Sequence, residues 1–94
     1  MTVIGLCELD LHMEGIQSLK SKRGIIKRIK ARVSNKFNVS VAEVDYLDTW
    51  QRSTLAVVVV ANDQRFANEV LSKAVNLVAS CSEAMLIGQR MTFY

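Results

Sequence analysis

The 94-residue sequence contains no proline, two cysteines and a single histidine. No proline, linker or low-complexity segment argues for a second domain. The two cysteines, Cys7 and Cys81, are too few for a disulfide-stabilised secreted scaffold and match no metal-ligand spacing. Each lies in an apolar run, so we expect buried, reduced thiols rather than a bridge or a reactive nucleophile. We expect no metal site and no cofactor.

Long hydrophobic runs are also missing. The longest, Leu55 to Ala61, is far too short to span a bilayer. The first residues already alternate and include Glu8 and Asp10, so we expect no signal peptide. Half of the residues are hydrophobic and 22% are charged, a globular rather than a disordered composition. We therefore expect a cytoplasmic protein without membrane contact, folded as a single domain over residues 1–94.

Acidic residues are absent between Gly15 and Ala42. Within this window, residues 18–37 hold eight of the twelve basic residues. Ser18 is a suitable N-cap, and the helix should end near Lys36. The apolar residues of this segment recur at the three-to-four spacing of an amphipathic helix: Leu19, Ile26, Ile29, Val33 and Phe37. One segment therefore both packs the fold and carries most of the positive charge.

The remaining elements alternate regularly along the chain. Strands are predicted over Thr2–Met13, Val39–Leu47, Gln51–Ala61 and Ala84–Tyr94. A second helix runs from a cap at Asn62 or Asp63 to about Ser80, with an apolar stripe of Phe66, Val70, Ala74 (or Leu71), Leu77 and Val78. The order βαββαβ predicts the α+β, ferredoxin-like fold: a four-stranded antiparallel sheet, strand order 4-1-3-2, with two helices on one face.

Two helices cover only one face of such a sheet. On the other face the first strand presents Ile4 and Leu6, and the third strand presents Val58 and Val60. An apolar patch of this kind usually marks an interface, so these four residues predict a homodimer. The alternative is a weakly hydrophobic surface that stays open to solvent.

Several motifs together resemble the small bacterial YlxP-like proteins. They are Leu9-Asp-Leu-His12, Ser18-Leu-Lys-Ser-Lys-Arg23, Phe37-Asn-Val-Ser-Val-Ala-Glu-Val44, Trp50-Gln-Arg52 and Val60-Ala-Asn-Asp63. The resemblance covers almost the whole chain and implies the ferredoxin-like fold. It brings no catalytic residues. Family members are often encoded beside translation and ribosome-maturation factors, so the resemblance implies a connection with RNA or the ribosome.

The first turn of the basic helix is the main candidate site. Helix N-termini favour anions, yet Lys20, Lys22 and Arg23 crowd this one. Together with Ser18 and the free backbone N–H groups they predict an anion or RNA site, which Lys27 and Lys30 extend along the helix. The alternative is a solvated basic face that maintains solubility. Sheet-face reading of RNA is not expected, because the first and third strands carry no aromatic residue.

Two further groups have competing interpretations. Trp50 and Arg52 form a secondary candidate surface that could stack on a base or a partner side chain, although such a Trp can also pin a hairpin against its own fold. His12 lies on one strand face with Glu8 and Asp10, which fits either an acid–base or metal cluster or a solvated surface. Acylphosphatases share the predicted fold, but residues 12–17 lack their glycine-rich loop with an arginine at the helix start.

These observations predict a non-enzymatic cytoplasmic protein that associates with RNA or the ribosome through residues 18–37. The alternative is a homodimeric protein-interaction or small-anion-sensing module that uses the apolar sheet face.

Overall fold

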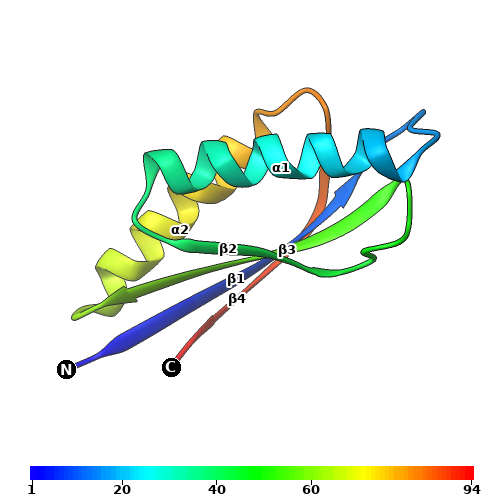
Figure 1. Cartoon of the computed structure of the whole chain (residues 1–94). Coiled ribbons are helices and arrows are strands. Elements are labelled where there is room, and N and C mark those ends of the chain that lie inside the picture. Colours follow the sequence, from blue (N-terminus) through cyan, green and yellow to red (C-terminus); the bar gives the residue numbers. More distant parts are fainter.

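Four strands and two helices form two layers in the computed structural model, which describes all 94 residues. The elements are β1 (Val3–His12), α1 (Leu19–Lys36), β2 (Ser40–Asp45), β3 (Arg52–Ala61), α2 (Gln64–Ala79) and β4 (Met85–Phe93). All strand pairs are antiparallel, and the sheet order is β2-β3-β1-β4, the predicted order read from the opposite edge. Both helices lie on one face of the sheet (Figure 1). The predicted ferredoxin-like α+β fold is confirmed.

Side-chain caps set the starts of both helices. The Ser18 side chain accepts a hydrogen bond from the backbone N–H of Ser21 at 3.1 Å, as predicted for an N-cap. Of the two predicted caps of α2, Asp63 is the one used, because its carboxylate accepts from the N–H of Phe66 at 3.2 Å. Each cap satisfies a backbone donor that has no partner inside the helix.

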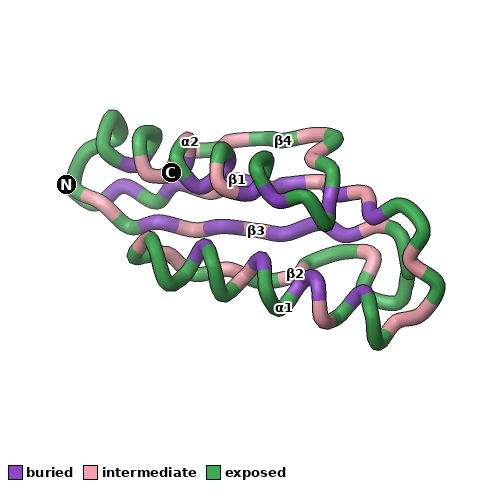
Figure 2. Tube along the Cα trace, turned by 90° about the horizontal axis from the view of Figure 1, so that it is seen from above, coloured by how far each residue is buried: buried purple, intermediate pink, exposed green.

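The core lies between the helices and the inner faces of the central strands β1 and β3 (Figure 2). Alternate residues of β1 are buried from Val3 to Leu11, as a strand with one covered face requires. Gly5 lets α2 approach closely: a Cβ atom at this position would lie 2.9 Å from Leu71 Cδ1. Cys7 and Cys81 are buried and unpaired, and burial raises the pKa of the Cys7 thiol to about 11.

Two local predictions were wrong. Phe66 was expected in the apolar stripe of α2, but it is about half exposed, and the smaller Ala67 is buried instead. The second strand ends at Asp45 rather than Leu47 because Tyr46 has a left-handed backbone, with φ at 61°. This residue begins the connection to β3, which we call the hairpin loop (residues 46–51).

Candidate functional site

Four basic side chains follow the outer side of α1 at intervals of three and four residues, and we call them the basic stripe: Lys20, Arg23, Lys27 and Lys30. Lys30 is half-buried, and the other three are exposed. A separation of ten residues along a helix corresponds to about 15 Å. The structure therefore brings these four predicted site residues together as one continuous surface.

The basic stripe has almost no acidic partner within the chain. Its one ion pair joins Arg23 Nη2 to Asp48 Oδ1 at 3.9 Å, between side chains that are 64% and 90% exposed. Such a pair contributes little, since water screens both charges. No acidic side chain lies within 4 Å of the ammonium groups of Lys20, Lys27 and Lys30. Their charge is available to an external anion.

The opposite flank of α1 is used within the fold. Arg28 donates from Nε to Glu83 Oε1 at 3.1 Å, and this hydrogen bonding lowers the pKa of Glu83. Arg32 Nη1 donates to Cys81 Sγ at 3.2 Å. These contacts tie α1 to the segment between α2 and β4, so the two arginines are not part of the basic stripe.

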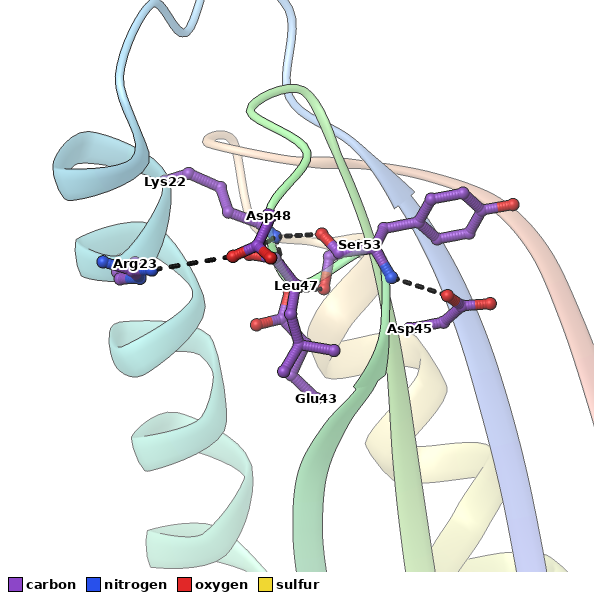
Figure 3. A network of polar contacts seen from close by, with 8 residues as sticks. Lys22, Arg23, Glu43, Asp45, Leu47, Asp48 and Ser53 are labelled. Carbon is purple, nitrogen blue, oxygen red and sulfur yellow. Dashed lines mark hydrogen bonds and ion pairs between the residues drawn. The ribbon is translucent and has the colours of Figure 1, made fainter.

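Lys22 does not belong to the predicted anion site. Its side chain is fully buried, and the ammonium Nζ lies 2.7 Å from Glu43 Oε2 (Figure 3). It also donates to the backbone carbonyls of Tyr46 at 2.6 Å and Leu47 at 3.2 Å. Ser53 donates to the same Glu43 carboxylate at 2.6 Å. A buried ammonium with all its protons bonded to protein oxygens has none left for an external phosphate.

The burial of Lys22 was visible in the sequence. It precedes Ile26 by four residues and Ile29 by seven, so it shares their face of the helix. A lysine on an apolar stripe is rarely left unpaired, which predicts a carboxylate partner. Ser18 is also occupied, because its Oγ caps the helix and donates to Ser21 Oγ at 3.1 Å. Of the six residues of the predicted site, Ser18 and Lys22 are therefore engaged within the fold, and Lys20, Arg23, Lys27 and Lys30 remain on the outer side of α1.

The hairpin loop lies beside the first turns of α1. Lys22 holds its backbone, and Asp48 reaches Arg23 across the gap (Figure 3). On this loop the Trp50 side chain is 49% exposed. It follows Asp48 by two residues, and Asp48 is the partner of Arg23, so this part of the loop adjoins the end of the basic stripe that starts with Lys20 and Arg23.

Arg52, the other member of this predicted pair, is the first residue of β3. Its guanidinium lies over the ring of Tyr46, 4.5 Å from the ring centroid, and its Nε atom is buried without a hydrogen-bond partner. Arg52 pairs with His12 across β3 and β1. Because its neighbour Ser53 is buried in the core, Arg52 belongs to the sheet face that the helices leave uncovered.

We call this uncovered side of the sheet the open face. Of its four predicted interface residues, Ile4 and Val60 are 40% and 67% exposed, and Leu6 and Val58 are half-buried. Strand pairing places Ile4 opposite Val60 and Leu6 opposite Val58. The four side chains therefore form one apolar patch at one end of the open face.

At the other end of the open face, three charged side chains contact one another: Glu8, Asp10 and Arg90. Asp10 accepts from Thr54 Oγ1 and from Arg90 Nη1, both at 2.8 Å. These two hydrogen bonds, Arg90's first, hold the pKa of Asp10 below its ordinary value. Glu8 lies 4.0 Å from the same arginine. No group of three or more His, Cys, Asp or Glu side chains could hold a metal ion.

A hollow of about 510 Å³ opens beside this end of the sheet. His12 and Met85 line one side, and Glu14 and Glu83 add two carboxylates. Glu83 is bonded to Arg28, so of the two carboxylates only that of Glu14 has no partner within the chain. Neither helix is long and apolar enough to cross a membrane.

Comparison with known proteins gives matches over most of the chain. Residues 4–91 match the family model described as "Protein of unknown function (DUF503)". The uncharacterized protein YlxP of Bacillus subtilis (strain 168) is 37% identical over 81 residues, which cover 86% of this chain and 88% of YlxP.

A solved structure matches with a TM-score of 0.48 and 11% identity: LarC2, the C-terminal domain of a cyclometallase involved in the synthesis of the NPN cofactor of lactate racemase, in its apo form. The match covers all of this chain, which spans 56% of the LarC2 chain. The resemblance to YlxP-like proteins seen in the sequence motifs is confirmed by the two sequence matches. The chain belongs to the family described as "Protein of unknown function (DUF503)".

Proposed function

We propose that this protein binds RNA through the phosphate backbone, with the basic stripe as the contact surface. The observation that carries the proposal is that the three lysines of the basic stripe, Lys20, Lys27 and Lys30, have no acidic partner. Three other cations of the chain, those of Lys22, Arg28 and Arg90, are already bonded to carboxylates. Phosphate oxygens are the acceptors that exposed lysines and arginines most often meet in nucleic acids.

The proposed mode is electrostatic, and it predicts a particular salt dependence. Four cations that neutralise phosphates of a single strand give a slope of about −3 for the logarithm of affinity against the logarithm of salt concentration. Between 50 and 200 mM salt the affinity should therefore fall by about 50-fold. Little sequence preference is expected, because phosphate contacts carry no sequence information.

Trp50 extends the same surface. Its exposed indole can stack on an unpaired base next to Arg23, which favours single-stranded RNA over a duplex. It is the only tryptophan of the chain, so its fluorescence reports on this contact alone.

Two charge-reversal variants test the proposal. Lys27→Glu with Lys30→Glu removes the C-terminal half of the basic stripe, and Arg65→Glu with Lys73→Glu on α2 changes the net charge by the same amount. Fluorescence anisotropy with labelled single-stranded RNA at low salt should show at least about tenfold weaker binding for the first variant only. Equal loss in both variants, or no binding by the wild type, contradicts the proposal.

We propose a binding role rather than catalysis, in the cytoplasm. The Glu8 and Asp10 carboxylates of the open face are paired with Arg90, and two buried unpaired cysteines suit a reducing compartment. Since genes of YlxP-like proteins often lie beside translation factors, ribosomal RNA is the first partner to test. The tagged protein should co-sediment with ribosomal subunits, and nuclease treatment should release it.

We also propose that the protein self-associates through the open face. This second role is favoured by the apolar patch around Val60, whose side chain is 67% exposed although it lies on a central strand. Exposed apolar patches of this type are usually covered by a partner. Light scattering across the micromolar range should give the mass of a dimer, and a monomer throughout contradicts this role.

A further inference from the structure

The open face presents two matching rows of side chains on its two central strands. From β1 they are Ile4, Leu6, Glu8, Asp10 and His12, and from β3 they are Val60, Val58, Ala56, Thr54 and Arg52. We propose that a second copy of this chain covers the open face, with a two-fold axis that runs along the strands between β1 and β3. This inference rests on the proposed self-association and adds its geometry.

The symmetry of such a dimer places unlike strands over each other. A two-fold axis between β1 and β3 puts β1 of one copy over β3 of the other, and the reverse pairing follows automatically. Because Ile4 is level with Val60 and Leu6 with Val58, each apolar side chain meets apolar side chains of the other copy. The apolar patch is therefore complementary to itself.

The charged end of the open face is also complementary under this axis. Arg52 on β3 makes no ion pair within its own chain, and its Nε atom is buried without a hydrogen-bond partner. In the dimer it lies over His12 of the other copy, and Asp10 is two residues, about 7 Å, further along the same face of β1. Arg90 of β4 is level with Glu8 and lies over Ala42 on β2 of the other copy, so it keeps the partners Glu8 and Asp10 of its own chain. The charge contact that the dimer adds is therefore the one from the Arg52 guanidinium toward the Asp10 carboxylate of the other copy.

The size of the contact favours this axis over one that crosses the strands. β1 and β3 each have ten residues, so the face measures roughly 33 Å by 19 Å, a footprint of about 600 Å². Stable interfaces bury about 800 Å² of accessible surface per partner, which such a corrugated face can supply. An axis across the strands through the apolar patch would overlap only about half of the face.

Cross-linking between the outer strands tests the axis. Ser40 on β2 and Thr92 on β4 are exposed, and both are level with Leu6. Two sheets packed face to face lie about 10 Å apart. With the proposed axis, Ser40 of one copy faces Thr92 of the other, whereas two Thr92 residues are separated laterally by three strand spacings, about 14 Å.

The experiment mixes Ser40→Cys and Thr92→Cys variants and treats them with a short bis-maleimide. A cross-linked dimer should form in the mixture and not in either variant alone. An axis across the strands would instead stack β4 of one copy on β4 of the other. A cross-link between two copies of Thr92→Cys would therefore overturn the proposed axis, while the self-association itself would stand. Native Cys7 and Cys81 are buried, so they should not react.

A charge at the centre of the patch tests whether this face is the one used. Val60→Glu places two unpaired charges in the interface, one from each copy. It should raise the dissociation constant of the dimer by about tenfold or more. The matched control is Phe66→Glu, which also replaces an exposed apolar side chain by a carboxylate, on α2 at the other side of the sheet. It should leave the dimer unchanged. A dimer that survives Val60→Glu overturns the inference, and a wild-type monomer overturns both it and the proposed self-association. Circular dichroism confirms that each variant is folded.

Discussion

A lysine ammonium and a glutamate carboxylate meet beneath the hairpin loop, where neither can reach bulk water freely. Lys22 is fully buried, and Glu43 receives hydrogen bonds from both Lys22 and Ser53. Burying such a pair is costly, so it adds little net stability compared with apolar side chains of similar size. Its effect is positional: it holds the loop that carries Trp50 against α1.

Removing one partner of this pair should be far more harmful than removing both. Lys22→Met leaves the Glu43 carboxylate without its cation, and we expect a loss of about 3–5 kcal/mol in the free energy of unfolding. Lys22→Met combined with Glu43→Met should recover much of this loss. Lys20→Met, on the exposed side of the same helix, is the control and should change stability by less than about 0.5 kcal/mol. Urea denaturation measures all three.

Asp10 should make stability depend on pH in the acidic range. Hydrogen bonds from Arg90 and Thr54 lower its pKa in the folded protein, while the unfolded chain keeps the ordinary value of 3.8. Between these two pKa values the unfolded state binds more protons, so stability rises with pH there. The contribution is fully present above pH 3.8 and is lost as the pH falls through the lowered pKa. Asp10→Asn should remove it, so denaturation midpoints of the variant and the wild type should converge at low pH.

At the scale of elements, the close packing of α2 on β1 requires a residue without a side chain at position 5, which is Gly5. A Cβ atom on Gly5 would lie 2.9 Å from Leu71 Cδ1 and 3.1 Å from Val59 Cγ1. Gly24, within α1, has only the flexible end of Arg28 nearby, at 3.3 Å. The two glycines therefore serve different purposes: one makes room for a helix, and the other has no packing role.

The same substitution at these two glycines should have opposite effects. Gly5→Ala overfills the core and should destabilise the protein by about 1–3 kcal/mol. Gly24→Ala raises helix propensity and should stabilise it by roughly 0.5–1 kcal/mol. Thermal denaturation of both variants measures the difference. If Gly24→Ala is instead destabilising, its glycine makes a contact that the isolated chain does not show.

Elements were easier to predict than the directions of single side chains. The order of strands and helices followed from period-two and period-3.6 patterns, which depend on many residues at once. Phe66 and Lys22 were assigned to the wrong surface because the judgement rested on residue type: a phenylalanine was assumed to be buried and a lysine exposed. Helical position decided both cases, since Ala67 and not Phe66 is in line with Leu71, and Lys22 is in line with Ile26.

The left-handed backbone at Tyr46 could not have been predicted from its residue type. Tyrosine rarely adopts a positive φ, and no glycine or asparagine marks the turn. The conformation is held by contacts that are distant in sequence, chiefly the bond from Lys22 to the Tyr46 carbonyl.

At the scale of the whole molecule, the helices and the open face lie on opposite sides of the sheet (Figure 1). A dimer formed through the open face would carry two basic stripes, one on each outer side. A long RNA that reaches both should bind more tightly than a short one through the higher effective concentration of the second site. Val60→Glu should therefore weaken binding to long RNA while leaving the affinity for a short oligonucleotide unchanged, as measured by fluorescence anisotropy. Equal affinity of the wild type for both lengths would exclude bridging.

Placing the helices on one side of the sheet also keeps the two surfaces independent under mutation. The basic stripe lies on α1, and the apolar patch lies on the open face of β1 and β3, so the sheet lies between them (Figure 1). Effects of substitutions at sites this far apart usually add. Substitutions in the basic stripe should therefore leave the apolar patch unchanged, and the reverse also holds. A relative could lose one of these two surfaces and keep the other on the same fold.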